Sequence, residues 1–419
     1  MVKRALLVSI AAEGITTLAM LLTFRLAADA WGAEGLSQWV LARRVVTLVF
    51  PAAVLGLDIA LTLALARHSR AASELTHYLA GALPAVVLGS GGIALLMALF
   101  PAAASTLLFG SSNYVSLLAP VAALIGALGL HVVMFAFLRG TMHFVAGNIL
   151  HVLVYGALPI AAILMLGLQP GATLLALSAG VAVVVMLVGF KWLRAAARAR
   201  DVLTTTRELL RNGLPRVPAA FGVLALFGIP PIAVAHVDTL VNAAFLSLGM
   251  SLVTISGSAF SPLAVVLLPV AARARAAQNT GALLSRVAYL IPFALVVGVG
   301  VAVVLLFASD LMSRALIGHP DPNLTHIFRW VGLAAAPYIY FVCIRPLVDA
   351  HASSFTITGL VIGAGLVFVV VAASAHWLFG FAALDSALFA HVGSIYALAL
   401  GTYVQFRRLV RDAVSPPRE

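Results

Sequence analysis

A succession of long apolar blocks fills almost the whole chain of 419 residues, and this feature most constrains the fold. A block of about 20 apolar residues forms a helix that can cross the hydrocarbon core of a bilayer. Inside lipid the backbone polar groups must bond within the segment, which a helix achieves. Only 9% of the residues are charged, against about 25% in soluble proteins. The sequence therefore predicts an all-α polytopic membrane protein, since the short alternating segments of a membrane barrel are missing.

Twelve membrane spans are predicted from these blocks, at 5–29, 38–66, 76–100, 113–138, 148–168, 172–193, 214–236, 240–270, 283–308, 325–349, 353–377 and 383–406. Six spans precede a basic stretch and six follow it, which predicts two six-helix lobes related as parallel repeats. The expected division is an N-terminal lobe 1–193, a basic cytoplasmic linker or interfacial helix 194–212, a C-terminal lobe 213–406 and a cytoplasmic tail 407–419.

The charges of the loops predict the orientation of the spans. Lysine and arginine in short loops favour the cytoplasmic side. One set of termini and loops holds 18 of them, whereas the opposite set holds only Arg314. Both termini are therefore expected in the cytoplasm. The net charge of +11 follows from this topology and from attraction to anionic membrane lipid, so nucleic acid is not expected as a partner. The basic stretch is typical of a cytoplasmic anchor, with recognition of lipid head groups as the alternative.

The sequence lacks the motifs of several enzyme classes. It has neither a G-x-x-x-x-G-K-[ST] phosphate loop nor an H-E-x-x-H zinc motif. Cys343 is the single cysteine, so neither an internal disulfide nor a cysteine metal site is expected. The first apolar block imitates a signal peptide, but Glu13, Arg25 and the length of the block favour a retained first span. No catalytic residue, metal or cofactor is predicted.

The second predicted span, "QWVLARRVVTLVFPAAVLGLDIALTLALAR", carries charges that a lipid-facing helix would not tolerate. At about 100° per residue, Arg44 and Asp58 fall on one polar stripe. Thr47 and Arg43 lie beside it. Polar stripes in membrane helices face the interior of a bundle or a water-filled cavity. We therefore expect this stripe to line a cavity.

The depths of these charges follow if the first two spans form an antiparallel hairpin. In such a hairpin, two residues at the same depth, one from each helix, have residue numbers that add up to a nearly constant value. Arg25 lies level with Arg43 and Arg44 in the outer half of the membrane. Glu13 lies level with Asp58, closer to the cytoplasmic ends. The hairpin therefore predicts a cationic layer above an acidic layer.

Local explanations remain open for several polar groups. Arg25 and Arg43 are near helix ends and could snorkel to the outer interface, with the carboxylates at 29 and 34 as partners. Arg345 and Asp349 are four residues apart, so an ion pair within one helix is expected. The histidines within spans are expected to be hydrogen-bonded packing residues rather than proton carriers: His131, His151 and His391.

The seventh and eighth predicted spans carry two further polar features. Arg216 lies in "RNGLPRVPAAF", where the seventh span begins, and prolines 215, 218, 230 and 231 are expected to bend or break this span. Interrupted helices often mark a transporter's binding site, although a harmless kink is the alternative. The eighth span carries a helical line of hydroxyls, which is expected to line a cavity or simply to allow close packing: Ser247, Ser251, Thr254, Ser258 and Ser261.

With these features, the chain resembles the multidrug/oligosaccharidyl-lipid/polysaccharide (MOP) exporter superfamily, and within it the polysaccharide (O-antigen type) flippases. The resemblance covers the twelve spans and the two six-helix lobes. It is carried locally by "FRLAADAWGAEGLSQWVLARRVVTLVFPAAVLGLDIALTLALAR", by "NGLPRVP" and by "LLPVAARARA".

The resemblance implies two lobes around a central cavity and an alternating-access mechanism in the bacterial inner membrane. The implied substrate is an undecaprenyl-pyrophosphate-linked oligosaccharide, moved from the cytoplasmic to the outer leaflet for cell-surface polysaccharide synthesis. A polysaccharide polymerase or glycosyltransferase is an expected partner. By helix and depth, Arg25, Arg43 and Arg44 match the cavity arginines that hold the pyrophosphate, and Arg216 is a further candidate. Arginine suits this ligand because its guanidinium binds phosphate in a bidentate manner.

Transport needs an energy source, for which a gradient of H+ or Na+ is expected. The candidate coupling groups are Glu13, Asp58 and His391. A MATE-like multidrug or cation antiporter of the same fold is the alternative function, although a layer of arginines disfavours it. A membrane scaffold without transport activity and an embedded acyl- or glycosyltransferase are two more distant alternatives.

Overall fold

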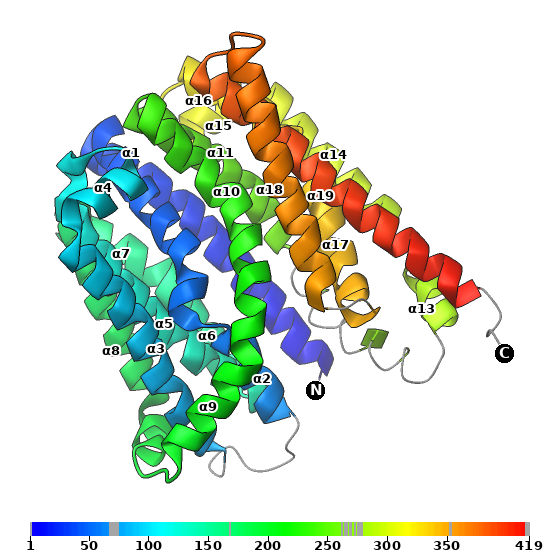
Figure 1. The fold of residues 1–419 in the computed structure, drawn as a ribbon. Coiled ribbons are helices and arrows are strands. Elements are labelled where there is room, and N and C mark those ends of the chain that lie inside the picture. The colour runs from blue at the N-terminus through cyan, green and yellow to red at the C-terminus, as the bar shows by residue number, and fades with distance from the viewer. Residues whose placement is uncertain are drawn as a thin grey trace. The chain divides into compact units, whose positions relative to one another are not determined.

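A computed structural model describes residues 2–66, 75–166, 169–260, 280–351 and 354–414, with a few isolated residues between 263 and 274. Every regular element in this part of the chain is helical (Figure 1). Ten helices are long and apolar enough to cross a membrane, or eleven if one bent pair counts as a span. The first of them contains the first predicted span and the first part of the second. The all-α polytopic fold predicted from the sequence is therefore confirmed, whereas the orientation of the termini stays a prediction.

The chain divides into two compact units. Unit 1 contains residues 1–224, 239–244 and 316–318, and unit 2 contains residues 225–238, 245–315 and 319–419. The predicted lobes 1–193 and 213–406 differ from these units in detail, because the helix Val217–Val237 (α10) is divided between them.

Unit 1 is built from helices that pack around α5. Its elements in chain order are α1 (Val2–Val54), α2 (Leu57–Ala66), α3 (Thr76–Leu99), α4 (Pro101–Phe109), η1 (Ser112–Leu117), α5 (Leu118–Gly140), α6 (Phe144–Val152), η2 (Leu153–Ala157), α7 (Leu158–Leu166), α8 (Pro170–Ala196), α9 (Val202–Gly213) and η3 (Leu214–Arg216). Helix α5 contacts α1, α2, α3, α6 and α8. Because these helices are apolar on most sides, the unit buries its interior and exposes further apolar side chains, as a membrane-embedded bundle does.

The first element, α1, consists of two helices that meet at Gly32. This glycine has φ 64° and ψ −167°, a backbone conformation that residues with a Cβ rarely adopt. The chain turns there, and the second half of α1 runs back beside the first (Figure 1). This is the hairpin that the sequence predicts for the first two spans.

The second predicted span, 38–66, is not continuous. Helix α1 ends at Val54 and α2 starts at Leu57, with positive φ at Leu55 and Gly56 between them. Pro51 lies one turn before this break. The prediction of one polar stripe through Arg44 and Asp58 requires a continuous helix between the two residues. Because the helix breaks between them, this prediction is wrong beyond Val54.

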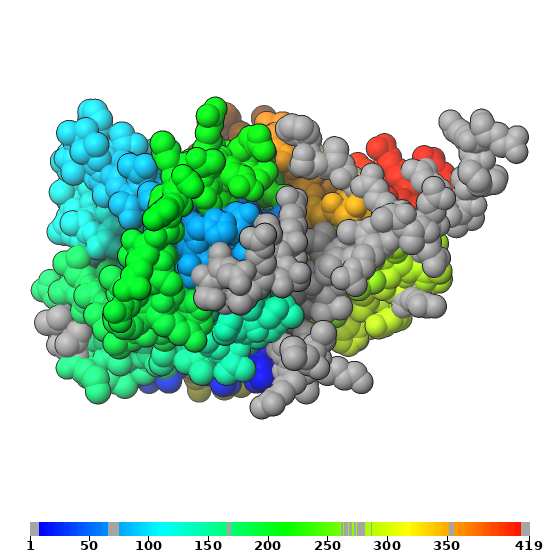
Figure 2. Space-filling view, turned by 90° about the horizontal axis from the view of Figure 1, so that it is seen from below, coloured from blue at the N-terminus to red at the C-terminus, as the bar shows by residue number. Residues whose placement is uncertain are grey.

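Helix α9 packs against the break. Gly56 lies very close to Gly213, the last residue of α9. A Cβ on Gly56 would collide with the backbone of Gly213, and a Cβ on Gly213 would collide with the backbone at Leu55 and Gly56. The Thr206 hydroxyl donates a hydrogen bond of 2.7 Å to the carbonyl of Gly81 on α3. Figure 2 shows α9, in green, beside the blue α2 on this surface. The predicted linker 194–212 is therefore largely a packed helix of unit 1.

The remaining helices lie wholly or mostly in unit 2, with the first residues of α10 and α11 and the last of α15 belonging to unit 1. They are α10 (Val217–Val237), α11 (Leu240–Ser258), α13 (Thr280–Val287), α14 (Leu290–Phe307), α15 (Ser309–Ile317), α16 (Pro322–Gly332), α17 (Ala335–His351), α18 (Ser354–Trp377) and α19 (Ala383–Val414). Helices α16 and α17 form the bent pair, with an angle of 45°. Helix α10 runs through Pro230 and Pro231 without interruption. The expected break in the seventh span therefore does not occur at this proline pair.

Candidate functional site

The four candidate arginines lie in different environments, and Arg25 is partly exposed. Its Nε donates to the Oδ2 of Asp29 at 2.8 Å, and about a third of its side chain is exposed. This pairing matches the local explanation given above for Arg25. Its expected role in anion binding stays a prediction.

Arg43 and Arg44 lie on the second half of α1, and Arg44 is the buried one of the two. Arg44 is 8% exposed and interacts with other described residues. The Arg43 guanidinium lies 5.6 Å from the centre of the Trp39 ring, and its Nη1 is buried. Arginine within a membrane span is costly unless it faces polar groups, so both positions mark a polar region inside unit 1.

Asp58 and Arg216 are brought together by the break in the second span. Asp58 lies in the first turn of α2, where a carboxylate interacts favourably with the helix dipole. Arg216 follows α9 on η3, is exposed, and lies within electrostatic range of Asp58. Asp58 therefore lies near Arg216 and at the N-terminus of a helix. The predicted depths of the charges in the first two spans did not indicate either feature.

Glu13 has a histidine as its neighbour. Its Oε2 lies 3.8 Å from the Nε2 of His151, and it is also within electrostatic range of Arg139. Both side chains of the Glu13–His151 pair are partly exposed. A carboxylate beside a histidine can exchange a proton with it. The expected role of Glu13 in coupling stays a prediction.

The hydroxyl face of α11 is more buried than an open cavity wall would be. Ser247 and Ser251 are 1% and 5% exposed. The hydroxyls of Ser251, Thr254 and Ser258 each donate to a carbonyl of their own helix. Ser261 lies outside the described residues. On α1, Thr47 is exposed, and its hydroxyl donates to the Arg43 carbonyl at 2.9 Å. The cavity-lining role stays a prediction.

His391 and the Arg345–Asp349 pair lie in unit 2. His391 is fully buried, its Nδ1 is 3.2 Å from the carbonyl oxygen of Leu226, and its ring packs against Phe227. These contacts are those of a packing histidine. Arg345 and Asp349 form the predicted ion pair within one helix, at 3.2 Å, which is confirmed.

Two residues near the histidines of unit 1, Tyr155 and Arg139, were not singled out by the sequence. Tyr155, on the π-helical turn η2, contacts His131 and His151 and interacts electrostatically with Arg43. Arg139 stacks on Phe135, 5.2 Å from its centre. The residues in contact come from α5, α6 and η2, so no spacing along the chain could have grouped them.

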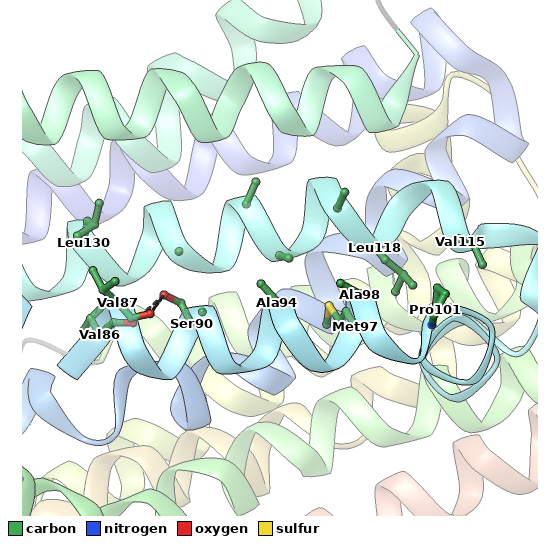
Figure 3. A pocket seen from close by; sticks show the side chains of 15 residues that line it. Val86, Val87, Ser90, Ala94, Met97, Ala98, Pro101, Val115, Leu118 and Leu130 are labelled. Carbon is green, nitrogen blue, oxygen red and sulfur yellow. Dashed lines mark hydrogen bonds between the residues drawn. The ribbon is translucent and has the colours of Figure 1, made fainter. Parts of the chain in front are cut away.

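An apolar groove of about 640 Å³ lies along the packed helices α3 and α5 of unit 1 (Figure 3). Small side chains such as Ala94 and Ala98 leave this space open. Ser90, the polar residue that lines it, donates its hydroxyl to the carbonyl of Val86 at 2.6 Å. Because its lining carries no charge and has one hydroxyl among apolar residues, this groove is unsuited to a pyrophosphate or a sugar.

The described geometry defines a polytopic helical membrane protein with a buried arginine, Arg44, in its first unit. No family model and no curated protein matches the sequence. Solved structures do match. The inward-facing conformation of a multidrug resistance MATE family transporter of the MOP superfamily has a TM-score of 0.78 and 14% identity, over 98% of this chain and 100% of that one.

Two further structures extend the comparison. The lipid II flippase MurJ, in an inward closed conformation, has a TM-score of 0.69 at 14% identity, over 97% of this chain and 91% of that chain. The eukaryotic MATE transporter AtDTX14 has a TM-score of 0.67 at 12% identity, over 98% and 99%. The chain therefore has the fold of the MOP superfamily, as the sequence resemblance predicts. At this level of identity the likeness establishes the fold alone.

Proposed function

We propose that this protein is a flippase that moves an undecaprenyl-pyrophosphate-linked oligosaccharide from the cytoplasmic to the outer leaflet by alternating access. The observation that carries the proposal is Arg44, an arginine with 8% exposure in the membrane-spanning second half of α1. A buried guanidinium in a membrane span is costly, so it is retained for an interaction with anionic groups. The fold shared with a lipid II flippase supports the same substrate class.

Arg44 is the first candidate for contact with the pyrophosphate, and Arg216 is the second. Arg216 is exposed and lies beside the break that Gly56 creates in the second span. Arg25 and Arg43 are weaker candidates, because Arg25 is paired with Asp29 and the Nη1 of Arg43 is buried. Guanidinium groups bind phosphate oxygens in pairs of hydrogen bonds, which lysine cannot reproduce.

Coupling to an ion gradient is proposed to occur at Glu13. The carboxylate lies 3.8 Å from His151, so protonation of either group changes the charge of the pair. Asp58 is the second candidate through its proximity to Arg216. His391 is the weakest of the three, because its contacts are those of packing.

The second candidate function is a MATE-like antiporter for cationic drugs. The structural likeness to MATE transporters, with a TM-score of 0.78 in one case, favours it. The arginines of α1 oppose it, since a cavity that attracts cations needs an excess of carboxylates.

Deletion and complementation in the source organism separate the two functions. Loss of the gene should abolish a surface glycan and cause its lipid-linked precursor to accumulate, without a change in sensitivity to cationic drugs. Restored glycan on complementation supports the flippase. Increased drug sensitivity with normal surface glycan would instead support the antiporter.

A further inference from the structure

Three exposed cations lie on one face at the end of α8. We name them the α8 basic face: Lys191, Arg194 and Arg198. At about 100° per residue, they lie within about 60° of one another and of Leu187, which is one turn earlier. Leu187 is 72% exposed, and Val183, a further turn back, is 56% exposed. One face of α8 therefore changes from exposed apolar to exposed cationic side chains.

This change of character marks the edge of the hydrocarbon core. Helix α8 is long and apolar enough to cross a membrane, so its exposed apolar side chains face lipid. Arg198 follows in the turn that closes the helix, where its N–H donates to the carbonyl of Ala195 at 3.1 Å. Side chains on a helix tilt toward its N-terminus, so Arg194 and Arg198 reach back toward the membrane. The head-group layer is roughly 5–8 Å thick, and Lys191 and Arg194 are about 4.5 Å apart along the helix, so both fit within this layer.

The α8 basic face has no counter-charge in the described part of the chain. None of its three cations has a carboxylate within 4.0 Å there. Residues 75–200, which include α3 to α8, contain neither aspartate nor glutamate. The Lys191 Nζ instead lies 4.1 Å from the centre of the Trp192 ring, which packs against the His143 ring at 5.2 Å. An aromatic ring therefore positions this ammonium, and neutralisation is left to an anion from the surroundings.

The surroundings of the α8 basic face favour one kind of anion. A phosphate accepts a pair of hydrogen bonds from a guanidinium. An anionic phospholipid offers this phosphate together with acyl chains that cover Leu187 and Val183. A zwitterionic lipid has no net charge to offer, and an acidic protein segment has no acyl chains for the apolar part of the face. The helix dipole favours cations in the last turn of a helix, but Lys191 lies before that turn of α8.

We propose that the α8 basic face is a binding site for one anionic phospholipid, whose phosphate meets Lys191, Arg194 and Arg198 and whose acyl chains lie along Leu187 and Val183. For this part of the basic stretch, recognition of a lipid head group thus adds to the role of a simple anchor. The site is separate from the substrate contact assigned to Arg44, and it does not depend on the proposed transport function.

Fluorescence quenching by brominated lipids tests this proposal on the full chain in phosphatidylcholine nanodiscs. A variant that keeps Trp192, with the other tryptophans changed to phenylalanine, reports on the lipid beside Lys191. Brominated phosphatidylglycerol should quench Trp192 at low mole fraction and then saturate, whereas brominated phosphatidylcholine should quench only in proportion to its mole fraction. Arg194→Gln/Arg198→Gln should raise the half-saturating fraction of phosphatidylglycerol about 20-fold, because each cation near an anionic lipid contributes about a factor of five. Equal quenching by the two lipids, or an unchanged curve in the double variant, would overturn the proposal.

Two further variants control for net charge and for position. Arg407→Gln/Arg408→Gln removes two exposed arginines at the end of α19 in unit 2 and should leave the half-saturating fraction unchanged. Arg194→Lys/Arg198→Lys keeps the charge and should bind phosphatidylglycerol more tightly than the glutamine variant. Equal weakening by the α19 variant, or identical behaviour of the lysine and glutamine variants, would contradict the assignment.

The parent chain offers a test that needs no substitution. Its melting temperature in nanodiscs should rise and then level off as phosphatidylglycerol replaces phosphatidylcholine, because a ligand that binds the folded state stabilises it. Salt at about 1 M shortens the Debye length to about 3 Å and should remove most of this rise. A melting temperature that does not respond to phosphatidylglycerol, or a rise that persists in full at high salt, would reduce the face to a general membrane anchor.

Discussion

At the scale of single residues, neighbouring arginines on one helix have different surroundings. Arg44 is nearly buried and has protein contacts, whereas Arg43 stacks on Trp39 and has no described carboxylate partner. Arg25 is paired with Asp29 near the turn at Gly32. The sequence could place all three at one depth, but side-chain direction decides which of them can meet a ligand.

Arg44→Gln tests the substrate contact. Removal of a charged hydrogen bond to the pyrophosphate should reduce glycan export about 10- to 100-fold. Arg44→Lys should recover only part of the activity, since a single ammonium cannot bind in the bidentate manner of a guanidinium. Export is measured by surface glycan, normalised to the amount of protein in the membrane. Full export by Arg44→Gln at normal protein level would remove Arg44 from the binding site.

Glu13→Gln tests the coupling site. The substitution keeps the size of the side chain but removes its charge beside His151. Transport driven by a pH gradient should fall to the level measured without a gradient, while passive exchange of substrate continues. Asp385→Gln, which disrupts the exposed His326–Asp385 pair of unit 2, serves as the control and should leave the response intact. A normal response in Glu13→Gln would exclude Glu13 from coupling.

At the scale of elements, the most informative departure from expectation is the break between α1 and α2. Pro51 and Gly56 are the two residues in the sequence that favour a break here. The span was predicted from hydrophobicity alone, which is continuous across both helices, so the break was missed. The break turns Asp58 into a residue of a helix N-terminus. It also lets α9 pack against the same point through Gly213.

Gly56→Ala tests the importance of this contact. Gly56 has φ 71°, and an added Cβ would collide with the backbone of Gly213. The substitution should therefore destabilise the protein by about 1–3 kcal/mol. Gly92→Ala is the matched control, because a Cβ at position 92 meets nothing within 4 Å. Thermal unfolding in detergent measures both. Equal melting temperatures for the two variants would show that the close approach is not required.

Cysteine labelling tests the hydroxyl face of α11. Ser251 is 5% exposed, whereas Ser256 is partly exposed. If the face is dry in this conformation, a cysteine at 251 should react with a water-soluble thiol reagent several-fold more slowly than one at 256. The native Cys343 is buried and adds little background. Faster reaction at 251 would instead support the water-filled cavity.

At the scale of the whole molecule, the apolar blocks were sufficient to predict the polytopic helical fold. A long apolar block forms a membrane-spanning helix however the helices pack together. For this reason α3, α5, α8 and α18 lie close to their expected spans. The details of the site could not be predicted in this way. Tyr155 on η2 contacts His131 on α5 and His151 on α6, and only tertiary packing brings these three rings together.

The most direct test of the central claim is a reconstituted assay with purified protein in liposomes. The substrates are a fluorescent undecaprenyl-pyrophosphate oligosaccharide and, separately, a fluorescent cationic drug. The flippase account predicts that the lipid-linked glycan becomes accessible to a membrane-impermeant enzyme at a rate that Arg44→Gln lowers, with no drug accumulation. Drug accumulation without movement of the glycan would contradict it.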